Sequence, residues 1–203
     1  MRRSCRAALL AFLALATAAY AQGSPKTLFL IARPGMPDPN FRETVVLVTQ
    51  EEGAEATGVI INRPTNRSLA DMLPSERFKP FKEPIFFGGP VAPQGLFAVF
   101  QVDRFSGAAV TMLPGLYLAV VPDSIDALLN NPPPKIRFFA GYSGWAPGQL
   151  RGELDRGDWL VVDAETDTVF LKDTSRLWQD MVRRASAVRA DAARSRRATF
   201  SSR

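Results

Sequence analysis

The stretch Phe138–Asp163 constrains the fold of this chain more than any other part of its sequence. Its first apolar run, Phe138–Ala140, predicts a strand that ends at Gly141, because glycine readily adopts turn geometry. Its second apolar run, Trp159–Val162, predicts another buried strand. Glycines and then helix-forming residues lie between the two runs, so the stretch predicts a strand, a turn, a helix and a second strand in succession.

The helix predicted within this stretch has a start, a buried face and an end that can be recognised in the sequence. Pro147 suits a first helical position, where its missing N–H costs nothing. Leu150 and Leu154 are four residues apart and therefore lie on one face. Gly157 is expected to close the helix in a left-handed conformation.

The rest of the chain predicts short strands with helices scattered among them. Thr44–Thr49 and Thr57–Asn62 are expected to pair as a hairpin. Ser68 and Asp123 are expected to cap helices, and a final helix is predicted from Ser175. Without regular strand–helix alternation, this order favours a single α+β domain over residues 22–182. The other predicted strands are Thr27–Ile31, Ile85–Phe87, Leu96–Val102, Ala108–Met112, Leu116–Val121 and Thr168–Leu171.

Four ordered motifs give the chain a resemblance to a known family. Ala32–Phe41 (ARPGMPDPNF), Gly58–Pro64 (GVIINRP) and Gly88–Val91 (GGPV) precede a longer signature within Phe138–Asp163. Together they resemble the YqgE/AlgH family of bacterial proteins, from roughly Thr27 to Arg183. The resemblance implies a mixed, barrel-like β-sheet flanked by helices. The signature positions are Gly141, Tyr142, Ser143, Gly144, Trp145, Gly148, Gln149, Leu150, Glu153 and Leu154.

The first 21 residues have the pattern of a secretory signal peptide. Arginines at positions 2, 3 and 6 precede the apolar run Ala7–Ala19, and cleavage is expected after Ala21. The apolar run is shorter than the roughly 20 residues that a membrane-spanning helix needs. The sequence therefore predicts a periplasmic or secreted protein, whereas the usual setting of the resembled family is cytoplasmic.

Two missing residue types limit the chemistry of the mature chain. Cys5, the only cysteine, lies in the predicted signal peptide, and the chain has no histidine. These absences exclude Ser-His-Asp and Cys-His catalysis and metal sites with histidine or cysteine ligands. We expect neither a cofactor nor a metal; any metal site would need oxygen ligands.

The formal net charge of +5 conceals an uneven distribution. The tail Arg183–Arg203 holds seven arginines and one aspartate, and the signal peptide holds three arginines, so residues 22–182 carry about −4. An acidic body is poorly suited to nucleic acid, and no nucleic-acid partner is expected if the protein is exported. The tail is predicted to be disordered and solvated, with binding to an anionic membrane surface or acidic polymer as the alternative.

The predicted binding residues belong to the four motifs. They are expected to form one surface, with Arg63 within a few ångströms of Glu153. Structural alternatives remain: Arg63 could bond nearby carbonyls, Glu153 could accept from the Trp145 indole, and Gly88-Gly89 could be a tight turn rather than an oxyanion cradle. The full set is Arg33, Asn62, Arg63, Gly88, Gly89, Tyr142, Ser143, Trp145, Gln149 and Glu153.

The sequence favours a non-enzymatic interaction or ligand-binding domain in the cell envelope. It assigns no catalytic residue, and leaves open the identity of the small-molecule or protein partner and the oligomeric state. A hydrolase using Glu153 or Ser143 is the enzymatic alternative, although Ser143 lacks the spacing of a nucleophile elbow. A third hypothesis, suggested by the family's best-known member, is cytoplasmic regulation of transcription, which requires that the signal peptide be false.

Overall fold

The computed structural model describes residues 26–50, 54–73 and 75–201. The predicted signal peptide, residues 1–21, lies outside them, as do the last two residues of the tail. The strands are β1 Lys26–Ala32, β2 Val45–Gln50, β3 Ala56–Ile60, β4 Pro64–Ser68, β5 Pro84–Phe87, β6 Val91–Gln101, β7 Ala109–Leu113, β8 Leu116–Ala119, β9 Ile136–Trp145 and β10 Trp159–Asp163. The helices are α1 Leu69–Met72, α2 Pro122–Asn130, α3 Gln149–Asp155, α4 Thr166–Val169 and α5 Leu177–Ser201, with a 3-10 turn η1 at Glu76–Phe78.

The strands form one curled sheet in the order β10-β1-β2-β3-β9-β6-β8-β7, with β5 also on β9 and β4 on β5. All pairs are antiparallel except β5 with β9, so the sheet is mixed. The curl brings the start of β1 close to the far edge, where the Thr27 hydroxyl donates to the Met112 carbonyl of β7. The predicted α+β class with a mixed, barrel-like sheet is confirmed, and the sheet is a curled half-barrel.

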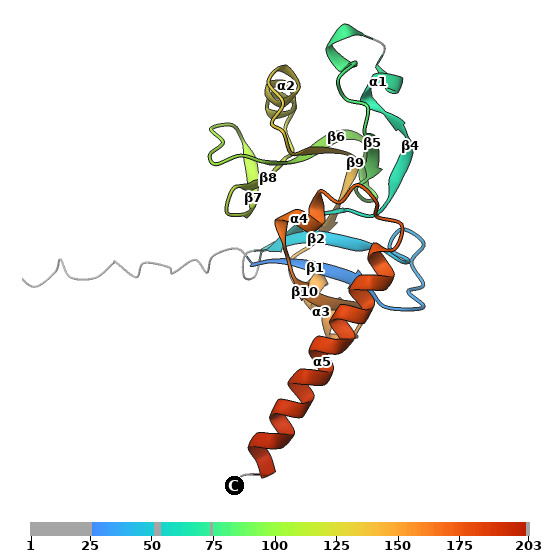
Figure 1. Ribbon diagram of the computed structural model, residues 1–203, viewed down its shortest axis with the longest axis vertical. Coiled ribbons are helices and arrows are strands. Elements are labelled where there is room, and N and C mark those ends of the chain that lie inside the picture. The colour runs from blue at the N-terminus through green and yellow to red at the C-terminus, as the bar shows by residue number, and fades with distance from the viewer. Residues whose placement is uncertain (1–25, 51–53, 74, 202–203) are drawn as a thin grey trace, which may run out of the picture.

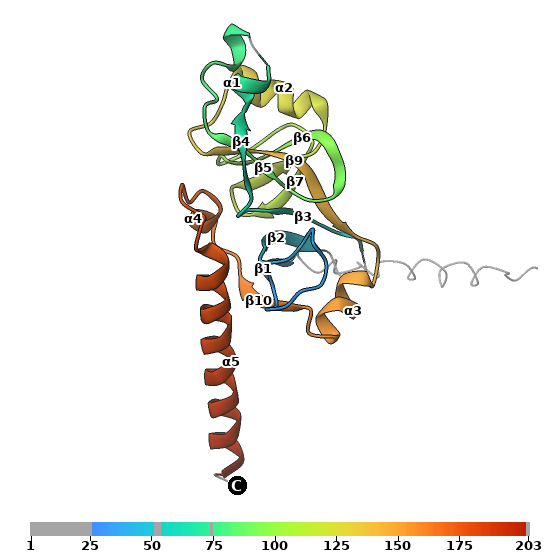
Figure 2. The same cartoon turned by 90° about the vertical axis from the view of Figure 1, so that its right-hand side faces the viewer.

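Strand β9 joins the two parts of the sheet (Figures 1 and 2). Its first half pairs with β5 and β6, and its end, Ser143–Trp145, pairs with β3. The upper part in the figures contains β4–β8, and the lower part contains β1–β3 and β10. The position of β9 therefore fixes how the two parts meet.

The lower part of the sheet is buried on both faces. In β1, Phe29 and Ile31 enter one apolar cluster, while Leu30 and Ala32 enter another, because successive side chains point to opposite faces. The first cluster is covered by the start of α5 and the second by Leu150 of α3. This two-sided burial explains why the strands of this part are continuous apolar runs.

The segment after β5 passes very close to β9. The Gly88 amide donates to the Ala140 carbonyl at 2.9 Å. A β-carbon added at Gly88 would lie only 2.2 Å from the Gly141 carbonyl oxygen, and one at Gly89 would lie 2.3 Å from the Tyr142 oxygen. Glycine is required here because no side chain fits between the two backbones.

Several local predictions are confirmed. β2 and β3 form the expected hairpin. Ser68 caps α1 in a reciprocal capping box with Asp71. Gly157 ends the α3 turn with a φ of +74°.

The prediction of a turn from Gly141 to Pro147 is wrong for most of these residues. β9 continues through the glycines to Trp145, because the glycine positions accommodate neighbouring backbone instead of reversing the chain. Helix α3 consequently starts at Gln149, with Gly148 as its N-cap and Pro147 outside the helix.

Two further local predictions are also wrong. Thr168–Leu171, predicted as the last strand, overlaps the short helix α4, and β10 is the last strand of the sheet. Asp123 lies in the first turn of α2 and makes no side-chain cap; Val121 is the N-cap and Pro122 follows it.

Helix α5 extends through most of the tail that the sequence predicted to be disordered. Leu177, Met181 and Ala185 bury one face of its first turns against the sheet. The helical backbone then continues to Ser201, consistent with the strong helix propensity of the alanines and arginines in this stretch. Among the helices of the described residues, we find none with the length and apolar composition that crossing a membrane would demand.

We predict that Gly88→Ala will destabilise the fold by about 3 kcal/mol, because its new methyl group meets backbone that cannot move aside. Gly35→Ala is the control. Gly35 has a φ of +78°, which disfavours a side chain, but nothing lies within 4 Å of an added β-carbon. The control should cost only about 1 kcal/mol. Urea unfolding of both variants measures the difference, and equal losses would contradict the steric role of Gly88.

Candidate functional site

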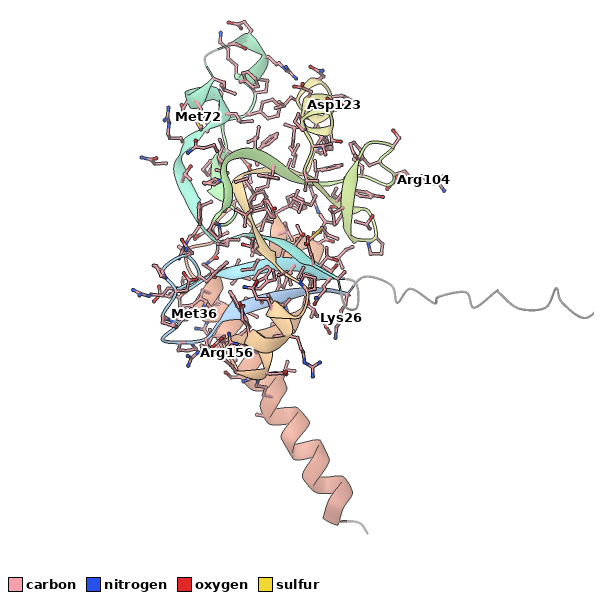
Figure 3. The ribbon with its side chains drawn as sticks, turned by 180° about the vertical axis from the view of Figure 1, so that it is seen from behind. Lys26, Met36, Met72, Arg104, Asp123 and Arg156 are labelled. Atoms are coloured by element: carbon pink, nitrogen blue, oxygen red, sulfur yellow. The ribbon has the colours of Figure 1, made fainter. Side chains whose placement is uncertain are left out.

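The loop between β1 and β2, residues 33–44, lies at the centre of the predicted site, and we call it the proline loop. Its Phe41 ring stacks on Trp145 with ring centroids 5.9 Å apart and meets Trp159 edge-on at 5.4 Å. Met36 of the same loop is also buried, and Figure 3 labels it on the lower part of the molecule. The loop is therefore packed against the sheet and does not hang free from it.

Arg63, between β3 and β4, donates hydrogen bonds to the backbone of the proline loop. Its Nη1 donates to the Asn40 carbonyl at 2.6 Å, and its Nη2 donates to the carbonyls of Arg42 at 2.7 Å and Pro39 at 3.3 Å. Burial lowers the pKa of Arg63, while the negative charges of Asp38 and Glu43 act in the opposite direction. The alternative that Arg63 binds nearby carbonyls is confirmed.

Asn62 fixes the last turn of the same loop. Its Nδ2 donates to the Glu43 carbonyl at 2.9 Å, and its Oδ1 accepts from the Val45 amide at 2.8 Å. Glu43 has a φ of +57°, which is unfavourable for a residue with a side chain. The two bonds from Asn62 hold this strained turn in place.

Glu153 of α3 ties the helix to two buried indoles. Its Oε2 accepts from Trp145 Nε1 and from Trp159 Nε1, each at 2.8 Å, and its Oε1 accepts from Gln149 Nε2 at 3.0 Å. The predicted bond between Trp145 and Glu153 is confirmed. Gln149 also accepts from the Ala146 amide at 3.2 Å, so it closes the turn before α3.

Arg63 and Glu153 bind different groups around Phe41. Arg63 binds the backbone on both sides of Phe41, whereas Glu153 binds the two indoles that contact its ring. Among the described residues, no ion pair joins Arg63 to Glu153. The two residues support one structural unit without a direct charge contact.

Arg33 supports the other end of the proline loop. Its Nε lies 3.5 Å from the Asp158 carboxylate, and its amide donates to the Asp158 carbonyl at 3.1 Å. Asp158 is at the start of β10 and also pairs with Arg156. Arg33 therefore joins the loop to the turn after α3.

Ser143 and the two glycines of GGPV meet inside the fold. The Ser143 hydroxyl is fully buried and donates to the Gly88 carbonyl at 3.0 Å, which also accepts from the Ile60 amide at 2.9 Å. The Gly88 amide donates to the Ala140 carbonyl and is therefore not available to an oxyanion, and Gly88-Gly89 passes along β9 instead of forming a tight turn. Tyr142 packs on Phe97 at 5.2 Å.

A cleft of about 390 Å³ opens beside Asn62 and Arg63. One wall is the end of the proline loop with Arg42 and Glu43, and the opposite wall is the segment 172–179 that leads into α5. Its lining is mainly polar and includes charged side chains of both signs. The lining residues are Arg42, Glu43, Asn62, Arg63, Pro64, Lys172, Asp173, Thr174, Ser175, Trp178 and Gln179.

Sequence reasoning missed the second wall of this cleft. Lys172–Ser175 is a polar run with no motif, and its sequence gives no sign that it returns to the proline loop. Trp178 brings it there by donating its indole N–H to the Ala32 carbonyl at 2.8 Å. Only Asn62 and Arg63 of the predicted binding residues line the cleft; the others support it or lie elsewhere.

Arg137 of β9 anchors the chain just before this wall. Its Nη1 donates to the Val169 carbonyl at 2.6 Å and its Nη2 to the Leu171 carbonyl at 2.7 Å, and its guanidinium lies over the Phe86 ring at 4.2 Å. Burial lowers the pKa of Arg137. The wall is thus held by side-chain bonds at both of its ends.

The described residues contain no group of three or more acidic, histidine or cysteine side chains placed to hold a metal ion. The Ser143 hydroxyl donates to a main-chain carbonyl, so no side-chain base receives its proton in this arrangement. The Glu153 carboxylate is used by three donors. The arrangement suits binding at the cleft better than proton transfer at the signature.

A protein-family model described as AlgH-like matches residues 29–188, which make up most of the chain. A UPF0301 protein of Myxococcus xanthus is 35% identical over 158 residues, which span 76% of this chain and 87% of that protein. A UPF0301 protein of Methylococcus capsulatus is 35% identical over 166 residues, 77% of this chain and 89% of that protein.

Solved structures show the same similarity. The solution structure of the AlgH protein from Pseudomonas aeruginosa superposes with a TM-score of 0.64 at 30% identity, over 77% of this chain and 87% of that one. The crystal structure of protein DIP2367 from Corynebacterium diphtheriae superposes with a TM-score of 0.57 at 25% identity, over 78% of this chain and 86% of that one.

We predict that Glu153→Ala will destabilise the protein by about 3 kcal/mol, because it leaves two buried indole N–H groups without an acceptor. Asp155→Ala on the same helix is the control: it removes only an exposed pair with Arg151 and should cost less than about 0.5 kcal/mol. Denaturant unfolding followed by tryptophan fluorescence provides the comparison. Similar small losses in both variants would show that the indole bonds contribute little.

Proposed function

The chain belongs to the AlgH-like family, and we propose that it is a non-enzymatic ligand-binding domain of the cell envelope. The observation that carries the proposal is the polar cleft between the proline loop and residues 172–179. Its ligand would be a small molecule with at least one anionic group, bound at this cleft and released unchanged.

The charged side chains at the cleft support an anionic ligand. Arg42 and Lys172 are both exposed and come from opposite walls, and no ion pair joins either of them to another described residue. Arg63 adds a third positive charge at the base of the loop, against the two carboxylates of Glu43 and Asp173. Guanidinium and ammonium groups that line one cleft are suited to carboxylate or phosphate oxygens.

The rigidity of both walls supports binding as well. Asn62 and Arg63 make four hydrogen bonds to the proline loop and one to Val45 at the start of β2, and Arg137 and Trp178 fasten the second wall to the body. Preformed walls reduce the entropy that a ligand must overcome. The strained Glu43 turn is typical of a functional position, where strain is maintained by the surrounding bonds.

The hydrogen bonds of the signature residues support a non-enzymatic function. Glu153, Trp145 and Gln149 satisfy one another, and Ser143 satisfies the Gly88 carbonyl. A general acid or base needs a proton path to a substrate, and a nucleophile needs a base beside it. The hydrolase hypothesis based on Glu153 or Ser143 therefore gains no support from these contacts.

The envelope setting is supported by the sequence of the first 21 residues. Its basic start, apolar run and small residues before Gln22 are typical of an exported protein. Regulation of transcription in the cytoplasm would require this segment to remain uncleaved.

We predict that at least one of four probes, citrate, succinate, glycerol 3-phosphate or inorganic phosphate, will raise the melting temperature saturably. A ligand at about 100 times its Kd would stabilise the fold by about 2.7 kcal/mol. Arg42→Gln combined with Lys172→Gln should abolish the shift, because both exposed cations of the cleft are lost. Thermal unfolding with each probe tests this.

The matched control for the cleft is Lys79→Gln combined with Lys82→Gln, which removes two exposed cations elsewhere and should keep the shift. Proton NMR of the bound probe should show it unchanged after prolonged incubation. Failure of all four probes, an equal shift in the cleft variant, or conversion of the probe would contradict the proposal.

We also predict that the protein expressed from its own start codon will be recovered from the envelope with Gln22 as its first residue. Ala19→Glu combined with Ala21→Glu should leave the full-length chain, because the cleavage site needs small residues at these positions. N-terminal sequencing after cell fractionation measures both outcomes. An intact chain in the cytosol of the unmodified strain would refute the envelope setting.

A further inference from the structure

Helix α5 leaves the body of the protein after its first turns. Ala185 is buried, but residues 186–190 are all exposed, on every side of the helix. Figures 1 and 2 show the rest of α5 extending away from the sheet, with its C-terminal end far from every other element. We call residues 186–201 the arm; at 1.5 Å per residue it is about 24 Å long.

The arm lies largely outside the family match. The match ends at residue 188, three residues after the last buried position of α5. The part of α5 that packs on the sheet is therefore within the shared domain, and nearly all of the arm is an addition to it. A separate role for the arm would not disturb the shared fold.

The charges of the body and the arm are separated along α5. Arg183 pairs with Asp180 and Arg184 pairs with Glu165, so the arginines next to the body are already partnered. The next one, Arg189, is exposed and forms no ion pair with any described residue. From residue 189 onward the sequence contains five arginines and one aspartate, whereas residues 22–182 carry about −4.

The helical period gathers most of these positions on one side of the arm. At about 100° per residue, positions 189, 194, 196 and 197 fall within an arc of about 160°. Position 200, a phenylalanine, falls inside the same arc, and Asp191 falls outside it. One side of the arm is thus basic, with an aromatic position among the arginines.

We propose that the arm binds an anionic phospholipid surface through this basic side. Guanidinium groups bind phosphate oxygens strongly, and each arginine near an anionic membrane strengthens binding about five-fold. Val188 and Phe200 are its only large apolar residues, so it binds at the surface without spanning it. The acidic body does not cancel this attraction, because charges are screened beyond about 8 Å at physiological salt.

The choice of lipid over nucleic acid rests on the proposed envelope setting, where phospholipid is the abundant polyanion. The surface would also stabilise the arm, since a helix of this length without tertiary contacts is marginal in water. Binding of the arm is independent of the cleft, so a failure of the probes at the cleft would leave this proposal standing.

The test compares the parent chain with a variant carrying Arg189→Gln, Arg194→Gln, Arg196→Gln and Arg197→Gln. Glutamine keeps high helix propensity, so the arm should remain helical. Co-sedimentation uses phosphatidylcholine vesicles with or without about one-third phosphatidylglycerol. Both proteins are prepared from Gln22 onward, so that the arginines and apolar run of the signal peptide do not bind the vesicles. Removal of the four arginines should lower partition onto the anionic vesicles at least about 50-fold.

The control removes the same charge from the body through Arg67→Gln, Lys79→Gln, Lys82→Gln and Arg104→Gln. All four side chains are exposed, and Figure 3 shows Arg104 pointing away from the body. This variant should bind within about three-fold of the parent, because its charges lie away from the arm. Hydrogen exchange should show the arm amides protected by anionic vesicles, and raised salt should remove the protection.

Three outcomes would overturn the proposal. The first is equal binding of the arm variant and the parent, and the second is equal loss of binding in the control. The third is tighter arm-dependent binding to duplex DNA than to anionic vesicles at matched phosphate concentration and salt, which would assign the arm to nucleic acid. If the protein is found in the envelope and any of these results is obtained, the proposal for the arm fails while the proposed envelope function stands.

Discussion

The close approach of Gly88 to Gly141 is the contact on which the rest of the structure depends. It lets the chain after β5 lie on β9 with no side chain between the backbones, so that the Gly88 amide and carbonyl are both bonded. β9 can then pair with β5 and β6 in one half and with β3 in the other. Both parts of the sheet, and therefore both walls of the cleft, are positioned by this crossing.

The family signature works mainly as a structural unit around the proline loop. Phe41 contacts Trp145 and Trp159, the two indoles share the Glu153 carboxylate, and Arg63 binds the backbone on both sides of Phe41. Both indole N–H groups and both terminal nitrogens of Arg63 have acceptors in this unit. Residues whose hydrogen-bonding groups bind one another hold a loop in position. The proposed binding of a ligand therefore depends on the exposed side chains at the edge of the loop.

The proposed ligand cleft and the proposed membrane-binding arm lie in different parts of the molecule. The cleft lies where the shared domain holds a strained turn against the segment before α5, and it offers a few charges of both signs. The arm begins where the buried face of α5 ends, and its sequence is strongly basic. Because the two regions are separate, the two proposals can be tested independently of each other.

The sequence by itself determined the α+β class, the β2–β3 hairpin, the capping of α1 by Ser68 and the left-handed end of α3 at Gly157, because each depends on local pattern or on one residue's backbone freedom. For Glu153 the sequence left two partners open, Arg63 and the Trp145 indole, and the structure shows the bond to Trp145. The strand path through Gly144 was not determined locally, because glycine permits turn and strand alike and only β3 beside it decides.

The tertiary structure alone decided the cleft. Lys172 is far from Arg42 in the sequence, and no periodicity predicts that Trp178 returns to Ala32 or that Arg137 holds the carbonyls of Val169 and Leu171. These bonds join segments that are more than 30 residues apart, and each depends on where the whole sheet has already placed its partner. Local residue preferences specify the elements, but side chains that bind distant backbone specify the site.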